Sequence, residues 1–203
     1  GYGMCTDNSG NIYVAGCYKG TATFDNVNIT SIGLFDIFIA KYNSSGTLMW
    51  LKTAGSSGSD EAVRIFIADD GSIYVAGTII GSAQFDGINV IVNGGPFAGE
   101  DLFLAKLSPD GNYQWIKSYG SSNQDWIDDM CISGNNIFLT GHYYGIFTAG
   151  PITLAPAGSS LAKFFMKVDA DGNPIWGKNT GGTSWVSASD DKLYIAGLFT
   201  GTA

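Results

Sequence analysis

The chain contains the stretch Ser72-Ile73-Tyr74-Val75-Ala76-Gly77, and related versions of it recur at three other places. These versions all end in glycine and are Asn11-Ile-Tyr-Val-Ala-Gly16, Asn136-Ile-Phe-Leu-Thr-Gly141 and Lys192-Leu-Tyr-Ile-Ala-Gly197. Their final glycines lie 61, 64 and 56 residues apart, which gives a period of about 60 residues. A fixed period of this kind indicates an array of similar supersecondary units.

A second motif repeats three times at the same period. Its tryptophans are Trp50, Trp115 and Trp176, which follow Gly46, Gly111 and Gly172 and the lysines Lys41, Lys106 and Lys167. Exposed tryptophans can act as sugar-stacking platforms, but a residue that occupies the same place in every unit is typical of packing between units. We therefore interpret these tryptophans, and the recurring glycines Gly16, Gly77, Gly141 and Gly197, as structural.

Each unit is expected to hold four strands, because runs rich in β-branched and aromatic residues alternate with turns of Gly, Asp, Asn and Ser. In the best-defined unit the predicted strands span 36–43, 47–53, 62–68 and 72–79. Runs such as Ile37-Phe-Ile-Ala40 are apolar at consecutive positions, so both faces of the sheet must be covered. Without helical periodicity, the covering layers must be other sheets.

These observations predict an all-β β-propeller with four-stranded antiparallel blades of about 60 residues. A two-sheet sandwich is the alternative, but it predicts alternating polarity and no long repeat. The predicted parts are a half blade over 1–35, blades over 36–100 and 101–160, and a shortened blade over 161–203. About three and a half blades cannot close a ring, since propellers use four to eight. We expect either a fragment of a longer protein or two copies that sum to seven blades.

One run of residues resembles a known family: Asp36-Ile-Phe-Ile-Ala-Lys41, then Trp50-x-Lys52, Gly55 and Asp69-Asp-Gly-Ser-Ile-Tyr-Val-Ala-Gly77. These motifs are similar to the SBBP-type β-propeller repeat, and the resemblance covers essentially the whole chain. Asp101-Leu-Phe-Leu-Ala-Lys106 repeats the opening, whereas the third copy has Ala162 in place of the leading Asp. The resemblance implies a secreted or surface-anchored bacterial protein whose propellers act in adhesion or scaffolding, and it does not imply an enzyme.

Charge and composition exclude several classes of partner. The chain has 18 acidic and 10 basic residues, for a net charge of -8, and no basic stripe to bind nucleic acid or an anionic membrane. Its apolar runs are far shorter than a membrane-spanning helix needs. The cysteines Cys5, Cys17 and Cys131 are interpreted as buried free thiols, with a Cys5 to Cys17 disulfide as the alternative.

Ligand binding is sought where a unit departs from the template, because a ligand usually engages only some blades. The candidate ligand-binding residues at these positions are Asp125, Trp126, Asp128, Asp129, His142, Tyr143 and Trp185. Carboxylates beside an aromatic ring suit a sugar, and carboxylate oxygens also suit Ca²⁺. A solvated strand entry and a structural histidine are the alternatives.

No cofactor or metal is predicted. Asp169-Ala-Asp-Gly-Asn173 resembles the start of a calcium loop but lacks the remainder, so calcium is possible in principle and not indicated. With one His and no G-x-S-x-G motif, the chain has almost no material for a nucleophilic triad.

Three functional hypotheses follow. The first is a non-catalytic secreted or cell-surface module for protein interaction, scaffolding or adhesion, in which the connections 86–100 and 150–160 contact a partner. The second is a carbohydrate-binding, lectin-like propeller, and the third is a glycosidase or lyase that uses two carboxylates. Expected partners are a protein or a glycan at the cell surface, and the remaining blades of a longer chain or a second copy of this one.

Overall fold

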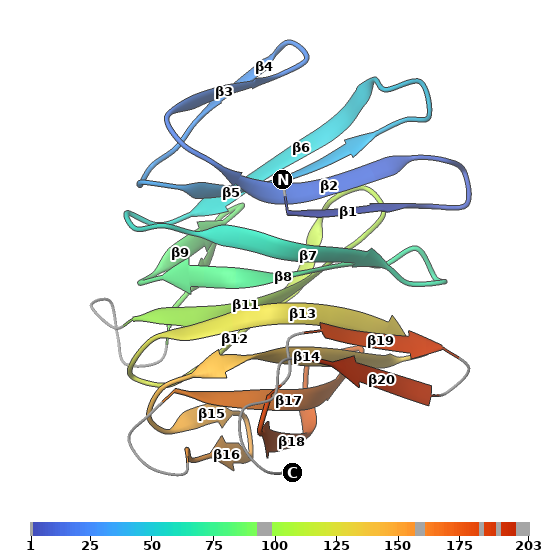
Figure 1. Ribbon diagram of the computed structural model, residues 1–203. Coiled ribbons are helices and arrows are strands. Elements are labelled where there is room, and N and C mark those ends of the chain that lie inside the picture. The colour runs from blue at the N-terminus through green and yellow to red at the C-terminus, as the bar shows by residue number, and fades with distance from the viewer. Residues whose placement is uncertain (1, 93–98, 157–160, 183–184, 190–191, 198–203) are drawn as a thin grey trace.

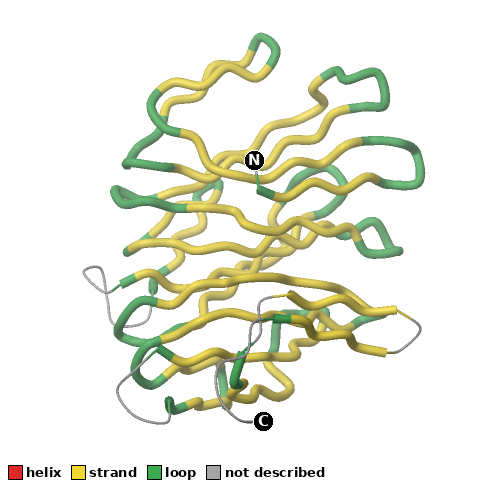
Figure 2. The backbone as a smooth tube through the Cα atoms, viewed as in Figure 1, coloured by secondary structure: helices red, strands yellow, loops and turns green. Residues whose placement is uncertain are grey.

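A computed structural model describes residues 2–92, 99–156, 161–182, 185–189 and 192–197 of the chain. Within these ranges the secondary structure consists of β-strands joined by turns and loops, with no helix (Figure 2). The all-β fold class predicted from the sequence is therefore confirmed.

The strands form three antiparallel sheets of four core strands each and one further hairpin, stacked in chain order (Figure 1). Sheet 1 contains, in spatial order, β1 (Gly3–Thr6), β2 (Ile12–Tyr18), β5 (Asp36–Tyr42) and β6 (Leu48–Gly55), and the short strands β9 (Ala83–Phe85) and β10 (Ile88–Val90) extend it beyond the end of β6. Sheet 2 contains β7 (Glu61–Ile67), β8 (Ile73–Ile80), β11 (Glu100–Leu107) and β12 (Tyr113–Tyr119). Sheet 3 contains β13 (Asp125–Ser133), β14 (Asn136–Tyr143), β17 (Ala162–Asp169) and β18 (Pro174–Thr180). The last hairpin pairs β19 (Trp185–Ser189) with β20 (Lys192–Ala196).

The sheets are offset by half a unit from the repeat seen in the sequence. Each sheet combines the last two strands of one sequence repeat with the first two strands of the next, so that β2 pairs with β5 and β8 with β11. The predicted blade boundaries at residues 36, 101 and 161 therefore fall inside sheets and need correction. A repeat in sequence fixes the period but not the phase at which the strands pair. The total of about three and a half blades is kept, and no closed ring forms among the described residues.

The connections between the second and third strands of each sheet form an outer row of short hairpins, which were expected to be loops. They are β3 (Thr21–Phe24) with β4 (Val27–Thr30), β9 (Ala83–Phe85) with β10 (Ile88–Val90), and β15 (Phe147–Ala149) with β16 (Ile152–Leu154). Asp25 and Asp86 adopt positive φ at two of the turns. The Asp86-Gly87 pair is a strong signal for a two-residue hairpin turn, so this element could have been found.

Both faces of the central sheet are buried, as the consecutive apolar runs predicted. On β8, Ile73 and Val75 point into the core between sheets 1 and 2, where Tyr13 of sheet 1 also lies. Tyr74 and Ala76 point the other way, into the core between sheets 2 and 3. Consecutive residues of one strand thus belong to two different interfaces.

The repeated tryptophans lie at the interfaces between sheets. Trp50 of sheet 1 packs on Gly111 of sheet 2, and its indole nitrogen donates a hydrogen bond to the carbonyl oxygen of Pro109 at 3.2 Å. Trp115 likewise packs its ring on Gly172 of sheet 3, although its buried indole nitrogen has no hydrogen-bond partner among the described residues. Because a side chain on either glycine would collide with the indole, a tryptophan at this interface requires a glycine on the facing turn.

Candidate functional site

The strands β1, β7, β13 and β19 begin the successive sheets and lie next to one another along one side of the stack. β7 and β13 each carry a β-bulge near the start, at Val63 and Asp128, where an extra residue interrupts the pairing. Bulges redirect side chains and are frequent near functional sites. The residues around the bulge of β13 are therefore the first place to look for a site.

His142 and Asp128 form a direct contact at this bulge. Nδ1 of His142 lies 3.0 Å from Oδ1 of Asp128, and each side chain is about one-fifth exposed. The second carboxylate oxygen of Asp128 is buried and has no hydrogen-bond partner. The bulge thus presents a carboxylate and an imidazole together.

Trp126 lies beside this pair and reaches toward sheet 2. It stands opposite His142 in the strand register, and its ring meets that of Tyr144 edge-on at a centroid distance of 6.0 Å. The indole of Trp126 also approaches the carboxylate of Glu100 on β11. Burial raises the pKa of Glu100, the nearby Trp126 side chain opposes that shift, and the charge of Glu61 adds to it.

We call this group the rim cluster. All its members are half-buried, and they are Glu61, Glu100, Trp126, Asp128, His142 and Tyr144. Three carboxylates, two aromatic rings and one imidazole from sheets 2 and 3 thus share one partly exposed surface.

Asp125 lies outside the rim cluster because its side chain is fully buried. Its carboxylate accepts hydrogen bonds from the backbone N–H of Ser121 at 2.6 Å and from the Ser121 hydroxyl. Asp60 makes the same contacts with Ser56 in the preceding repeat. These contacts assign both aspartates to the turns that lead into β7 and β13, where no ligand can reach them.

Burial makes Asp125 a source of pH-dependent stability. Desolvation raises its pKa from the usual 3.8 to about 6. Between these values the folded state holds a proton that the unfolded state releases, so the free energy of unfolding falls as the pH rises from about 4 to about 6. At about 1.36 kcal/mol per unit, this contribution totals roughly 3 kcal/mol.

Urea unfolding of wild type and Asp125→Asn at pH 4, 5, 6 and 7 measures this contribution. We expect the difference in stability between the two proteins to change by about 2–3 kcal/mol across the series. Burial raises the pKa of Asp60 as well, but Asp60 is present in both proteins and cancels in the comparison. Parallel stability curves would show that Asp125 keeps an ordinary pKa in the folded state.

Asp129 joins three sheets. Its Oδ1 lies 2.6 Å from Nε of Arg64 on β7, and its Oδ2 accepts a hydrogen bond from the backbone N–H of Val186 on β19 at 2.9 Å. Both side chains are mostly buried. The carboxylate is therefore fully engaged within the fold.

The remaining predicted ligand residues do not join the rim cluster. Tyr143 is buried, and its hydroxyl donates a hydrogen bond to Oδ1 of Asn179 at 2.6 Å. Trp185 is 54% exposed and belongs to the separate hairpin of β19 and β20. Of the seven predicted residues, the structure brings Trp126, Asp128 and His142 together.

Glu61, Glu100 and Arg64 were not predicted to be site residues. Glu61 and Arg64 stand on β7 where Trp126 and Asp129 stand on β13, as the pairing with β8 and β14 shows. Comparing the two repeats position by position reveals opposite charges at the Arg64 and Asp129 positions. That comparison was the available signal for the ion pair.

Neither a metal-binding group nor a membrane-spanning helix is found among the residues that the structure describes. No group of three or more His, Cys, Asp or Glu side chains there could hold a metal ion. Asp169 instead accepts hydrogen bonds from the backbone of Asp171 and Asn173, as expected for a turn. The same ranges contain no helix long and apolar enough to cross a membrane.

The three cysteines are free thiols and not joined by a Cys5 to Cys17 disulfide, but only Cys131 is buried, whereas Cys5 and Cys17 are half-buried. Burial raises the pKa of Cys5 to about 11 and that of Cys131 to about 12. Thiols with such values are protonated at neutral pH and react poorly as nucleophiles.

Comparison with known proteins supports the fold. No family model matches the chain. It is 29% identical over 173 residues to an uncharacterized WD repeat-containing protein of Acanthamoeba polyphaga mimivirus. This match covers 71% of this chain and 12% of that protein. The chain is also 25% identical over 141 residues to the regulatory protein FlaEY of Caulobacter vibrioides. This second match covers 70% of this chain and 15% of that protein.

The fold follows from these findings together. WD repeats build the four-stranded blades of β-propellers, and the sheets described above have that construction. The chain is built of β-propeller blades. It spans less than one-fifth of the length of either relative, so the similarity concerns a segment of those proteins.

Proposed function

We propose that this chain is a non-catalytic β-propeller module that binds a protein partner through the rim cluster. The observation that carries the proposal is the position of Trp126, which is half-buried among Tyr144, Glu100 and the Asp128–His142 pair. Partly buried tryptophans and tyrosines dominate the energetics of protein interfaces. The carboxylates of the cluster and the net charge of -8 favour a basic segment on the partner.

The setting of this activity is also part of the proposal. The resemblance of Asp36–Gly77 to the SBBP-type repeat supports a secreted or cell-surface location and a role in adhesion or scaffolding. We do not propose a glycosidase or lyase, because the buried Asp60 and Asp125 carboxylates are bound to their own turns. Carbohydrate binding is supported by a different surface, described below.

We also propose that a further blade packs on the outer face of sheet 1, from a longer chain or from a second copy. Gly111 and Gly172 are each covered by a tryptophan of the preceding sheet. Gly46 occupies the same place in sheet 1, yet no heavy atom lies within 4 Å of where its Cβ would be. The same turn is thus present without the tryptophan that covers it elsewhere.

The interaction at the rim cluster can be tested with a library of random 12-residue peptides displayed on phage. We expect selection on the wild-type chain to enrich basic peptides that bind at least tenfold more weakly to Trp126→Ala, because the central aromatic contact is lost. Trp185→Ala is the matched control and should bind within twofold of wild type. Failure to enrich any peptide, or equal binding to wild type and Trp126→Ala, would contradict the proposal.

A further inference from the structure

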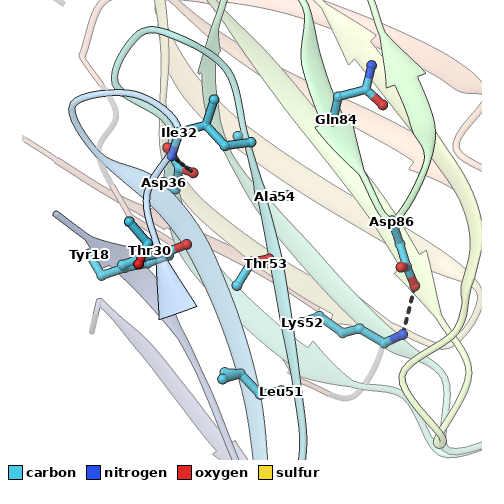
Figure 3. Close-up of a pocket in the computed structure, with 11 residues that line it drawn as sticks. Tyr18, Thr30, Ile32, Asp36, Leu51, Lys52, Thr53, Ala54, Gln84 and Asp86 are labelled. Carbon is cyan, nitrogen blue, oxygen red and sulfur yellow. Dashed lines mark hydrogen bonds and ion pairs between the residues drawn. The ribbon is translucent and has the colours of Figure 1, made fainter. Parts of the chain in front are cut away.

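A second surface lies at the outer edge of sheet 1, away from the rim cluster. It is a groove of about 330 Å³ along β6, between the hairpin of β3 and β4 and the hairpin of β9 and β10. Figure 3 shows Lys52 and Asp86 joined on one side, with Tyr18 and Thr30 on the other side and Thr53 between them. This volume is at the lower end of the range for small-molecule sites.

The groove exists because a contact found in the other two sheets is missing here. In sheet 2 the hydroxyl of Ser118 donates a hydrogen bond to the carbonyl of Ile91, and in sheet 3 the amide of Asn179 donates one to the carbonyl of Ala155. Each contact ties the outermost strand to the end of the nearby hairpin. Thr53 occupies the same register position in sheet 1, opposite Phe38 as Ser118 is opposite Phe103.

Thr53 makes no corresponding contact. Among the side-chain hydrogen bonds of the described residues, none joins Thr53 to Thr30, the position equivalent to Ile91 and Ala155. Both threonines line the groove instead. The turn of the β3–β4 hairpin is tied to β6, since Asp25 accepts a hydrogen bond from the backbone N–H of Leu48 at 2.8 Å. Its far end lacks the contact at Thr53, and this departure from the repeat leaves the groove open there.

The lining offers donors and acceptors without excess charge. Nζ of Lys52 lies 2.7 Å from Oδ2 of Asp86, which leaves further ammonium protons and the other carboxylate oxygen for a ligand. Gln84 adds its amide oxygen and Thr53 its hydroxyl. Asp36 is already engaged, since its carboxylate accepts hydrogen bonds from the backbone of Ile32 and Gly33.

Apolar surface is present beside these polar groups. Leu51 and the exposed side chain of Ile32 line the groove together with the ring of Tyr18. A paired cation and carboxylate do not select for an ionic ligand. The combination of neutral hydrogen-bonding groups, a balanced ion pair and apolar patches matches a molecule with many hydroxyls and apolar C–H faces.

We propose that this groove binds a neutral sugar residue of a glycan. The ion pair of Lys52 and Asp86 would bond the hydroxyls at one end, while Thr53 and Gln84 bond those nearest β6. The site is separate from the rim cluster, so it does not depend on the protein interaction proposed above.

Two pairs of matched variants test the assignment. Thr53→Trp fills the groove, and Ser118→Trp places the same side chain at the equivalent position of sheet 2. Lys52→Ala removes the ammonium group, and Lys117→Ala removes the lysine at the same repeat position of sheet 2. All four residues are half-buried on outermost strands, so folding is checked by comparing melting temperatures.

Binding is measured first on an array of neutral oligosaccharides and then, for the glycans retained, by saturation-transfer NMR. We expect Thr53→Trp to abolish binding and Lys52→Ala to weaken it at least tenfold, whereas Ser118→Trp and Lys117→Ala remain within twofold of wild type. An array without any bound glycan overturns the proposal, as does binding that Thr53→Trp leaves intact. Trp126→Ala should retain glycan binding, which separates failure here from failure at the rim cluster.

Discussion

Replacing Gly141 by alanine should destabilise the protein by about 3 kcal/mol or more. A Cβ atom at this position would overlap the carbonyl oxygen of Trp126 and lie 2.7 Å from Cε1 of Phe164. Neither the paired backbone nor the buried ring can move without disturbing sheet 3. The measurement is the free energy of unfolding from urea titration, followed by tryptophan fluorescence.

Gly177→Ala is the matched control for this substitution. Gly177 also lies in a strand of sheet 3, but its Cβ would meet only side-chain atoms, the nearest being Cγ2 of Ile152 at 3.1 Å. We expect a change below about 1 kcal/mol. Similar losses for both variants would mean that the close approach of β13 to Gly141 is not what constrains the position.

Replacing Asp129 by alanine should cost about 2–3 kcal/mol. The substitution leaves the Arg64 guanidinium and the N–H of Val186 without their shared acceptor. Removing one partner of a fully buried pair costs more, but Arg64 is 28% exposed and water replaces part of the lost interaction. Urea unfolding of the single variants Asp129→Ala and Arg64→Ala and of the double variant gives the coupling energy.

The coupling between Arg64 and Asp129 should exceed about 1 kcal/mol. Asp171→Ala provides the control, because Asp171 lies on an exposed turn and its loss should change stability by less than about 0.5 kcal/mol. Additive effects of the two single variants would show that the residues act independently. The contact between sheets 2 and 3 would then be stabilised by apolar packing alone.

The strands of the fold could be predicted because their signals are local. The predicted strand 62–68 corresponds to β7 at Glu61–Ile67, and the predicted strand 36–43 to β5 at Asp36–Tyr42. The partner of each strand could not be predicted in the same way. Pairing β2 with β5, and not β6 with β7, depends on how distant parts of the chain pack together, and no residue type records that choice.

The candidate site was predicted only in part, for a related reason. Trp126, Asp128 and His142 stood out because they depart from the repeat, and the structure places them together. Asp125 was also predicted to bind a ligand, but its carboxylate bonds Ser121, four residues earlier in the chain. The same spacing is present at Ser56 and Asp60 in the preceding repeat, so the sequence already indicated a structural role. The groove at Thr53 depends on a missing contact, which a single sequence does not display.

The half-unit offset of the sheets has a consequence for synthesis on the ribosome. Since β7 and β8 are completed by β11 and β12, a nascent chain that has released one full repeat still carries an unpaired edge at β8. That edge exposes backbone hydrogen-bonding groups, which attract other strands, until the next pair of strands emerges. Each sheet therefore passes through a stage in which only its first two strands have emerged, and the next pair of strands then covers the exposed edge.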